Sequence, residues 1–413
     1  MRKFSAVLLS LVLVSWNWCP FGGREQPVDP NAVVQEDVNY IITFWDVELP
    51  PVLAADAYRE RTEEIVRDFN ALKPNITVEM RWLPWDQAQA ELERALKNGV
   101  PPDLYADWQG IAKYNHTLQI PAELYLGDVL TPAAERGVTR QGERWAWPRF
   151  IWPAGLLALR SDLPVGDSEL DRLLERGWTW AELEDWLLEH NLQIIVNDYQ
   201  GRFSGQLLQA ATGRGLSRPP GPQEVFDILS RVEKLRDLRL LQSGGIEEIQ
   251  RGSTILGGAG MPTGFWLSEY FDEHLVLLPL PGIGENRYYP VTVLSLLHFR
   301  QARYQGDDHS RAVAQAAEYL SREQAARLGN MFYSAPAFAD LDWDSAGLPA
   351  WQYSFLTDAA RLGTPQEAVD NQTRQQEKRF REELNSVLVS FWDGKVDAAT
   401  VAQWILDHGG ESE

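Results

Sequence analysis

The chain of 413 residues contains one cysteine, Cys19, and six histidines that are scattered singly. One cysteine cannot form an intramolecular disulfide, so a disulfide-stapled scaffold is excluded. A chain of this length needs no such support, because it can bury about three quarters of its unfolded surface. The histidines show neither an HExxH pattern nor the close spacing of a zinc site. The sequence therefore predicts no metal and no cofactor.

Several catalytic motifs are missing as well. The sequence has no G-x-S-x-G nucleophile elbow, no P-loop and no EF-hand loop. Residues 258–262 depart from a dinucleotide-binding fingerprint, because a proline intrudes and the third glycine is absent. A pair of carboxylates for glycoside hydrolysis stays open as an alternative, although no pair stands out among the 59 acidic residues. We therefore expect a protein that is not an enzyme.

Positive charge is also scarce, with 38 Lys and Arg against 59 Asp and Glu and a formal net charge of −21. This balance argues against a nucleic-acid partner, which needs clustered Lys and Arg, and against adhesion of the folded surface to anionic lipid. Tryptophan, in contrast, is abundant, with 17 residues. Most of these indoles should serve packing, but the number also fits an aromatic-lined site for a ligand with flat apolar faces.

The N-terminal segment has the pattern of an export signal. Arg2 and Lys3 precede nine apolar or small residues at 6–14, a run too short to span a bilayer. We predict a signal peptide over residues 1–18 and a flexible tether over residues 19–37, which is rich in Pro and Gly.

A cysteine directly after an export signal resembles the lipid-attachment site of bacterial lipoproteins. Trp16 and Trp18 stand where that pattern has small residues, so an unmodified thiol at Cys19 is the alternative. Attachment of two acyl chains with a third on the amine would anchor the protein far better than one chain. The resemblance implies a protein held at the outer face of the cytoplasmic membrane, or in the periplasm.

From residue 38 onward, strand and helix patterns alternate. Residues 38–45 form a nearly continuous apolar run, and residues 76–82 alternate in polarity, which predicts two strands with a helix between them. Asp86 and Gln89 have the spacing of a capping box at the start of the next helix, before a short strand at 104–106. Two such β-α-β units predict an α/β fold with a parallel sheet.

A second alternation follows. Residues 145–159 are apolar and interrupted by two prolines, which favours an extended crossing segment over a helix. Thr179 and Glu182 have capping-box spacing for a helix that leads to a strand at 193–196. Further strands are predicted at 276–280 and 291–299.

Seven segments, in this order, resemble the extracellular solute-binding proteins of ABC importers, in the sugar-binding, maltose-binding-protein-like branch (family 1). They are residues 41–46, 69–78, 98–104, 142–148, 177–183, 257–266 and 278–282. The resemblance implies a two-lobed periplasmic-binding-protein-like fold of type II, with a ligand cleft between lobes that crossing strands join. It implies an N-terminal lobe and a C-terminal lobe with these bounds: 38–147 with 283–335, and 148–282 with 336–413.

The candidate ligand-binding residues follow from this resemblance and from one rule of α/β folds. Ligands of open α/β sheets bind beyond the carboxyl ends of the strands, where aromatic rings can cover a sugar face and polar groups can bind its hydroxyls. The candidates at such positions are Trp45, Asp46, Asp107, Trp108, Arg149, Trp152, Phe203, Gln206, Phe265, Trp266 and Tyr333. For each one, packing, helix capping or a hinge salt bridge is the alternative.

Capture is therefore favoured over catalysis. The resemblance implies a monomeric, exported lipoprotein that binds a mono- or oligosaccharide by lobe closure and delivers it to ABC permease subunits. The alternatives are a binding protein for a non-sugar solute, a ligand sensor for a membrane kinase and, less favoured, a secreted glycoside-processing enzyme. The sequence does not identify the sugar.

Overall fold

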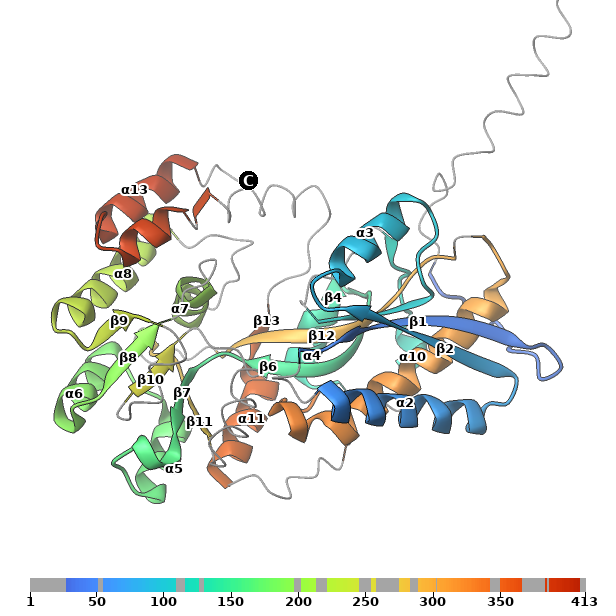
Figure 1. Cartoon of the computed structure of the whole chain (residues 1–413), viewed down its shortest axis with the longest axis horizontal. Helices are drawn as coiled ribbons and strands as arrows, with labels where there is room; N and C mark the ends of the chain where they lie inside the picture. The colour runs from blue at the N-terminus through green and yellow to red at the C-terminus, as the bar shows by residue number, and fades with distance from the viewer. Residues whose placement is uncertain are drawn as a thin grey trace, which may run out of the picture.

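The described part of the chain contains two large β-sheets with helices packed on them, arranged along one long axis (Figure 1), and a small two-stranded sheet. This agrees with the α/β class that the strand and helix patterns predict. The computed structural model describes residues 27–50, 55–108, 116–125, 130–196, 202–212, 221–244, 254–257, 275–282, 289–301, 303–341, 350–365, 383–384 and 386–408.

The first sheet has the strand order β13-β12-β3-β1-β2, and β6 pairs with β12 from the other side. Its strands are β1 (Tyr40–Glu48), β2 (Ile76–Pro84), β3 (Leu104–Asp107), β6 (Trp147–Pro153), β12 (Pro290–His298) and β13 (Thr364–Pro365). β1 is parallel to both β2 and β3, as the two β-α-β units predict. β12 runs antiparallel to β3 and to β6, so the chain returns to this sheet after it has built the second one.

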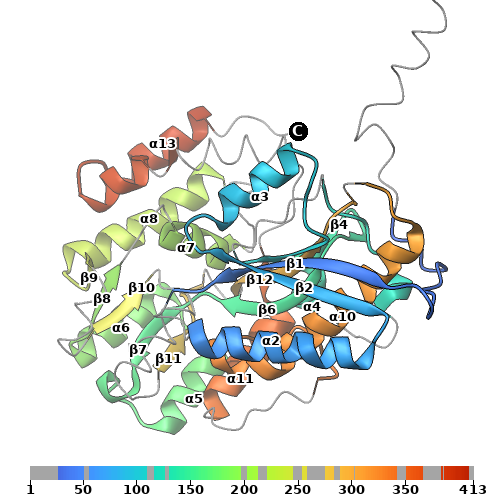
Figure 2. The same cartoon turned by 45° about the vertical axis from the view of Figure 1, so that its right-hand side comes forward.

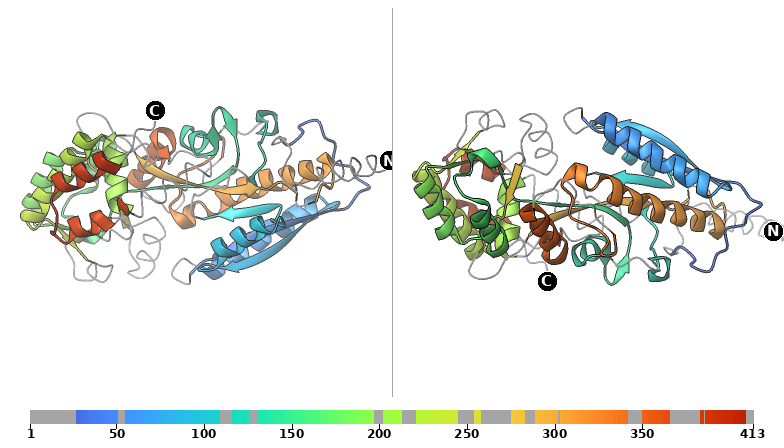
Figure 3. Two further views of the ribbon diagram at one scale, coloured as in Figure 1. Left: turned by 90° about the horizontal axis from the view of Figure 1, so that it is seen from above. Right: turned by 90° about the horizontal axis from the view of Figure 1, so that it is seen from below.

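Helices cover both faces of the first sheet. On one face, α2 and α10 lie side by side, and α3 lies on the other face beside β2 (Figures 2 and 3). Their bounds, with that of the short α4, are α2 (Ala55–Leu72), α3 (Ala88–Lys97), α4 (Pro132–Val138) and α10 (Asp307–Leu328). β1 buries Ile42 and Phe44 toward α2 and α10, because alternate residues of a strand face the same side.

The second sheet has the order β11-β7-β10-β8-β9. Its strands are β7 (Leu156–Leu159), β8 (Gln193–Val196), β9 (Leu241–Ser243), β10 (Thr254–Gly257) and β11 (Leu275–Leu278). The helices that follow or flank them are α5 (Asp167–Arg176), α6 (Trp180–His190), α7 (Arg202–Thr212), α8 (Pro222–Asp237) and α13 (Ala398–His408). The remaining elements are β4 (Thr139–Arg140), β5 (Glu143–Arg144), η4 (Ala122–Tyr125), η5 (Arg160–Asp162), η8 (Asn330–Phe332) and α11 (Ala350–Leu362).

β6 and β7 carry the chain from the first sheet to the second. β6 ends at Pro153 and β7 begins at Leu156, so the extended crossing segment predicted over 145–159 consists of these two strands. α11 packs against both α4 and α5, and β13, directly after α11, pairs with β12. Residues 350–365 therefore contact strands of the first sheet and also α5, a helix beside the second sheet. The predicted lobe bounds stay a prediction.

The two predicted capping boxes have different outcomes. Asp86 and Gln89 do not form one, because α3 begins only at Ala88 and its N-cap, Gln87, makes no capping hydrogen bond. The turn from Pro84 to Gln87 delays the helix, and the Gln89 amide bonds Glu93 instead. That prediction was wrong.

The second box is formed at the start of α6. The Thr179 hydroxyl accepts from the Glu182 backbone N–H, and the Glu182 carboxylate accepts from the Thr179 N–H. We expect Thr179→Ala to lower the free energy of unfolding by ~1 kcal/mol, because it leaves a backbone donor without its cap. Urea unfolding measures this, with exposed Thr357→Ala on α11 as the control. An equal change in the two variants would contradict the capping role.

Among the described residues, no helix combines the length and the apolar character that crossing a bilayer requires.

Candidate functional site

The carboxyl ends of β1 and β3 meet beside the crossing strand β6. In the parallel pairing of β1 with β3, Phe44 lies opposite Leu104 and Trp45 lies opposite Tyr105. Asp46 and Trp108 therefore come together just beyond these pairs. The Trp108 indole Nε1 donates to Asp46 Oδ1 at 2.9 Å. This is the sheet edge at which open α/β folds place their ligands.

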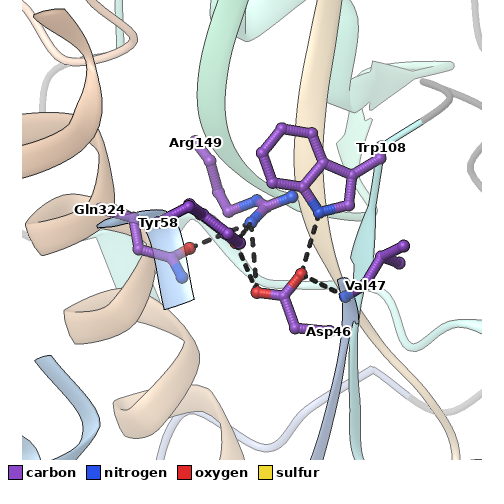
Figure 4. A network of polar contacts seen from close by, with 6 residues as sticks. All are labelled: Asp46, Val47, Tyr58, Trp108, Arg149 and Gln324. Atoms are coloured by element: carbon purple, nitrogen blue, oxygen red, sulfur yellow. Dashed lines mark hydrogen bonds and ion pairs between the residues drawn. The ribbon is translucent and has the colours of Figure 1, made fainter. Parts of the chain in front are cut away.

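Asp46 is fully buried and is the acceptor at the centre of a polar network (Figure 4). Besides the indole, its carboxylate accepts from the Val47 backbone N–H at 2.7 Å and from the Tyr58 hydroxyl at 2.5 Å. Burial raises the pKa of Asp46, while nearby Arg149 and these hydrogen bonds act in the opposite direction. These hydrogen bonds compensate the free energy that the carboxylate loses when burial removes its hydrating water.

Arg149 supplies the positive charge of the network. Its Nη1 lies 3.9 Å from Asp46 Oδ2 and donates to the Tyr58 hydroxyl and to Gln324 Oε1, both at 3.2 Å. Its guanidinium carbon lies 4.8 Å from the centre of the Trp108 ring. The network therefore joins four elements: β1, α2, β6 and α10 (Figure 4).

A β-bulge explains the inward direction of Arg149. In the pairing of β12 with β6, Leu294 lies opposite Phe150 and Ser295 lies opposite Pro148, so Arg149 is an extra residue on β6. A bulge breaks the alternation of side chains locally and can turn one of them toward a site. Here it places a 0 % exposed arginine inside an apolar strand.

Aromatic rings surround the network. Tyr58 meets the Trp108 ring edge-on, with centroids 5.1 Å apart, and Phe332 meets it at a similar angle at 5.5 Å. Trp152 lies 5.6 Å from Trp108 and is only partly buried. We call Tyr58, Trp108, Phe150, Trp152 and Phe332 the aromatic cluster. Trp152 is its partly exposed member, and so the one that a ligand from solvent would meet first.

Four of the predicted residues are brought together in this way: Asp46, Trp108, Arg149 and Trp152. The first three are buried, and the Asp46 carboxylate accepts its hydrogen bonds from the Val47 N–H, the Tyr58 hydroxyl and the Trp108 indole. Their contact with a ligand stays a prediction. In the structure, Asp46 and Arg149 contact the Trp108 ring of the aromatic cluster.

The other predicted residues lie elsewhere. Trp45 points to the opposite face of β1 from Asp46 and lies under the Arg81 guanidinium at 4.6 Å. Asp107 is buried opposite Ser295. Phe203 packs closely on Gly257 in the second sheet, and Gln206 is partly buried on α7. Tyr333 ends η8 with a φ of 46° and is partly buried. Phe265, Trp266 and Cys19 lie outside the described residues.

Sequence reasoning missed two members of the network. They are Tyr58, in the helix that the sequence predicts between the first two strands, and Gln324. Gln324 lies between Leu320 and Leu328 at four-residue spacing, so it occupies a core position of α10, and all three are buried. A polar residue at such a position is the signal that could have identified it, since a buried amide needs a partner.

Among the described residues, no group of three or more His, Cys, Asp or Glu side chains is arranged to hold a metal ion.

The chain resembles solved structures of sugar-binding proteins. The sugar-binding protein MalE from Xanthomonas citri matches with a TM-score of 0.64 at 15% identity, over 88% of this chain and 95% of that one. The maltose-maltodextrin binding protein of Alicyclobacillus acidocaldarius matches with 0.61 at 15%, over 89% and 99%. An ABC substrate-binding protein from Listeria monocytogenes, solved with cycloalternan, matches with 0.61 at 12%, over 88% and 96%.

At these identities the likeness shows a common fold. The chain has the two-lobed α/β architecture of these binding proteins, as the seven sequence segments predict. No family model and no curated protein matches the sequence.

Proposed function

We propose that the protein is an extracytoplasmic binding protein that captures a carbohydrate between its two lobes and delivers it to an ABC permease. The observation that carries the proposal is the convergence of Asp46, Trp108, Arg149 and Trp152 where β1 and β3 end beside the strand that leads to the second sheet. The similar structures described with a sugar or as sugar-binding proteins support the ligand class.

Burial indicates which rings contact the ligand and which support them. The partly exposed ring of Trp152 offers a flat apolar face to the C–H face of a sugar, while Trp108 and Phe332 hold it from behind. Because β6 continues into β7, a ligand at Trp152 lies close to the connection between the sheets. Ligand contacts with both lobes then favour the closed form, which the permease recognises.

We also propose export and anchoring. The signal over residues 1–18 would direct the chain out of the cytoplasm, and lipid on Cys19 would hold it at the membrane through the tether. The folded part would act as a monomer.

Trp152→Ala tests the proposed platform. We expect it to weaken sugar binding by at least tenfold, about 1.4 kcal/mol, because it removes the ring that covers the sugar face. Intrinsic tryptophan fluorescence, titrated with mono- and oligosaccharides, measures binding. Trp85→Ala is the matched control, since Trp85 is 39 % exposed just beyond β2 and should leave affinity unchanged.

Two results would contradict the function. One is saturable binding of a peptide or a polyamine without a response to any sugar. The other is turnover of a chromogenic glycoside, which would indicate an enzyme. Equal affinities of the two variants would reject Trp152 as the platform but leave carbohydrate binding intact.

A further inference from the structure

The polar network contains buried donors that have no acceptor. In the part of the chain that the structure describes, the side-chain hydrogen bonds of Arg149 come from Nη1, and its Nε and Nη2 have no partner. Gln324 Nε2 and the Trp152 indole Nε1 are likewise buried without a partner. All four atoms are donors.

The unused atoms of Arg149 form one functional edge. Nε and Nη2 lie on the same side of the guanidinium, and their N–H bonds point in parallel, which is the fork that binds a carboxylate through two hydrogen bonds. The planar face of the same group lies over the rings of Trp108 and Phe150, at 4.8 and 5.2 Å. The rings hold the guanidinium in a fixed plane, so the fork has a defined direction.

Asp46 does not accept hydrogen bonds from Nε and Nη2 of Arg149. Its two oxygens accept from Val47, Tyr58 and Trp108, and the approach of Arg149 is through Nη1, at 3.9 Å. A buried charged donor without an acceptor costs more than a neutral one, because it has lost its water and gained nothing in return. An acceptor that arrives with the ligand would remove this cost.

We propose that the carbohydrate is acidic and that its carboxylate binds the Nε–Nη2 fork of Arg149. This inference rests on the proposed function and names its substrate class: an oligosaccharide that contains a uronic acid. The Trp152 indole N–H, which is also unpaired, lies in the plane of its ring and donates to an oxygen of a neighbouring unit of the oligosaccharide, while the ring face covers the apolar face of one sugar. Selectivity comes from this local fork, since the whole chain carries a net charge of −21.

A matched pair of ligands tests the proposal on the full chain. We would titrate trigalacturonate, trimannuronate and a glucuronic-acid-bearing xylotriose calorimetrically, each against its methyl ester. The ester keeps the sugar and removes the charge. We expect at least one acid to bind tenfold or more tightly than its ester. The preference should persist at about 0.5 M NaCl, because salt screens buried pairs much less than exposed ones.

Arg149→Lys should reduce the preference for the acid to less than threefold, since lysine keeps the charge but has no fork. Arg144→Lys is the control, because Arg144 bonds Glu135 away from the network and should leave the preference unchanged. If Arg149→Lys does not fold, the comparison of acid and ester on the unaltered chain still shows whether the protein prefers an acidic ligand.

The outcomes separate the two proposals. Binding of neutral sugars or esters as tightly as the acids would overturn the acidic ligand and leave the proposed function standing. A preference that disappears in salt would also overturn it, because it would come from surface charge. Failure of every saccharide, acidic or neutral, would reject the proposed function itself.

Discussion

Asp46→Ala is expected to lower the free energy of unfolding by about 3–5 kcal/mol, the usual cost of removing one partner of a buried ion pair. The substitution leaves the Arg149 charge without its counter-charge. It also removes the acceptor of the Tyr58 hydroxyl and the Trp108 indole N–H. Tyr58 lies on α2, Arg149 on β6 and Trp108 directly after β3, so the loss should affect the packing around the first sheet rather than a single turn.

Urea unfolding followed by tryptophan fluorescence measures the change. Glu48→Ala is the matched control, because Glu48 also pairs with an arginine, Arg59, at 2.9 Å, but both side chains are nearly half exposed. An exposed pair contributes about 0–1 kcal/mol, so the control should change little. A loss below about 1 kcal/mol for Asp46→Ala would contradict the role of Asp46 as the buried counter-charge and acceptor of this network.

Acid is expected to destabilise the protein through His298, the last residue of β12. This side chain is buried, and its pKa is lowered to about 3, first by burial and then by the nearby His309 of α10. In the unfolded chain the pKa of a histidine is about 6.5. Between these two values the unfolded chain binds a proton that the folded chain does not.

The folded protein is therefore less stable at acid pH. Stability from this group is complete above pH 6.5 and falls as the pH drops toward 3, by at most ~1.4 kcal/mol per pH unit. Other groups near the pair are Tyr40, whose hydroxyl donates to Asp308, and the Ile41 carbonyl, which faces His309 Nε2. His309 lies in the first turn of α10.

Unfolding free energies measured in steps from pH 7 to pH 4 test this prediction. His298→Asn should flatten the dependence by close to one proton, whatever its stability at pH 7. His408→Gln, on an exposed position of α13, should leave the slope unchanged. Parallel curves for His298→Asn and the unaltered chain would contradict the assignment.

Much of the fold was predictable because local patterns carry it. Alternation at Ile76 and Val78 predicts β2, the prolines at 148 and 153 predict an extended crossing, and Thr179 with Glu182 predicts the start of α6. The same reasoning failed at Asp86, because spacing alone does not show that a turn delays the helix to Ala88. Sequence patterns predict only those features that contacts between neighbouring residues determine.

The composition of the site was partly predictable too, since Asp46, Trp108, Arg149 and Trp152 follow or lie within predicted strands. Their partners were not. Gln324 and Arg149 are 175 residues apart in the sequence, and no local pattern relates them. The extra residue that turns Arg149 inward depends on the register between β6 and β12, which is set only when the two strands pair.

The order of strands and helices and the aromatic and acidic residues at strand ends were thus determined by the sequence, through periodicity and turn chemistry over short distances. Tertiary structure alone decided that Asp46 is an internal acceptor, that Arg149 keeps one edge unpaired, and that Trp45 faces away from them. The physical reason is that burial and hydrogen-bond partners belong to packed surfaces. Those surfaces exist only after distant segments have met.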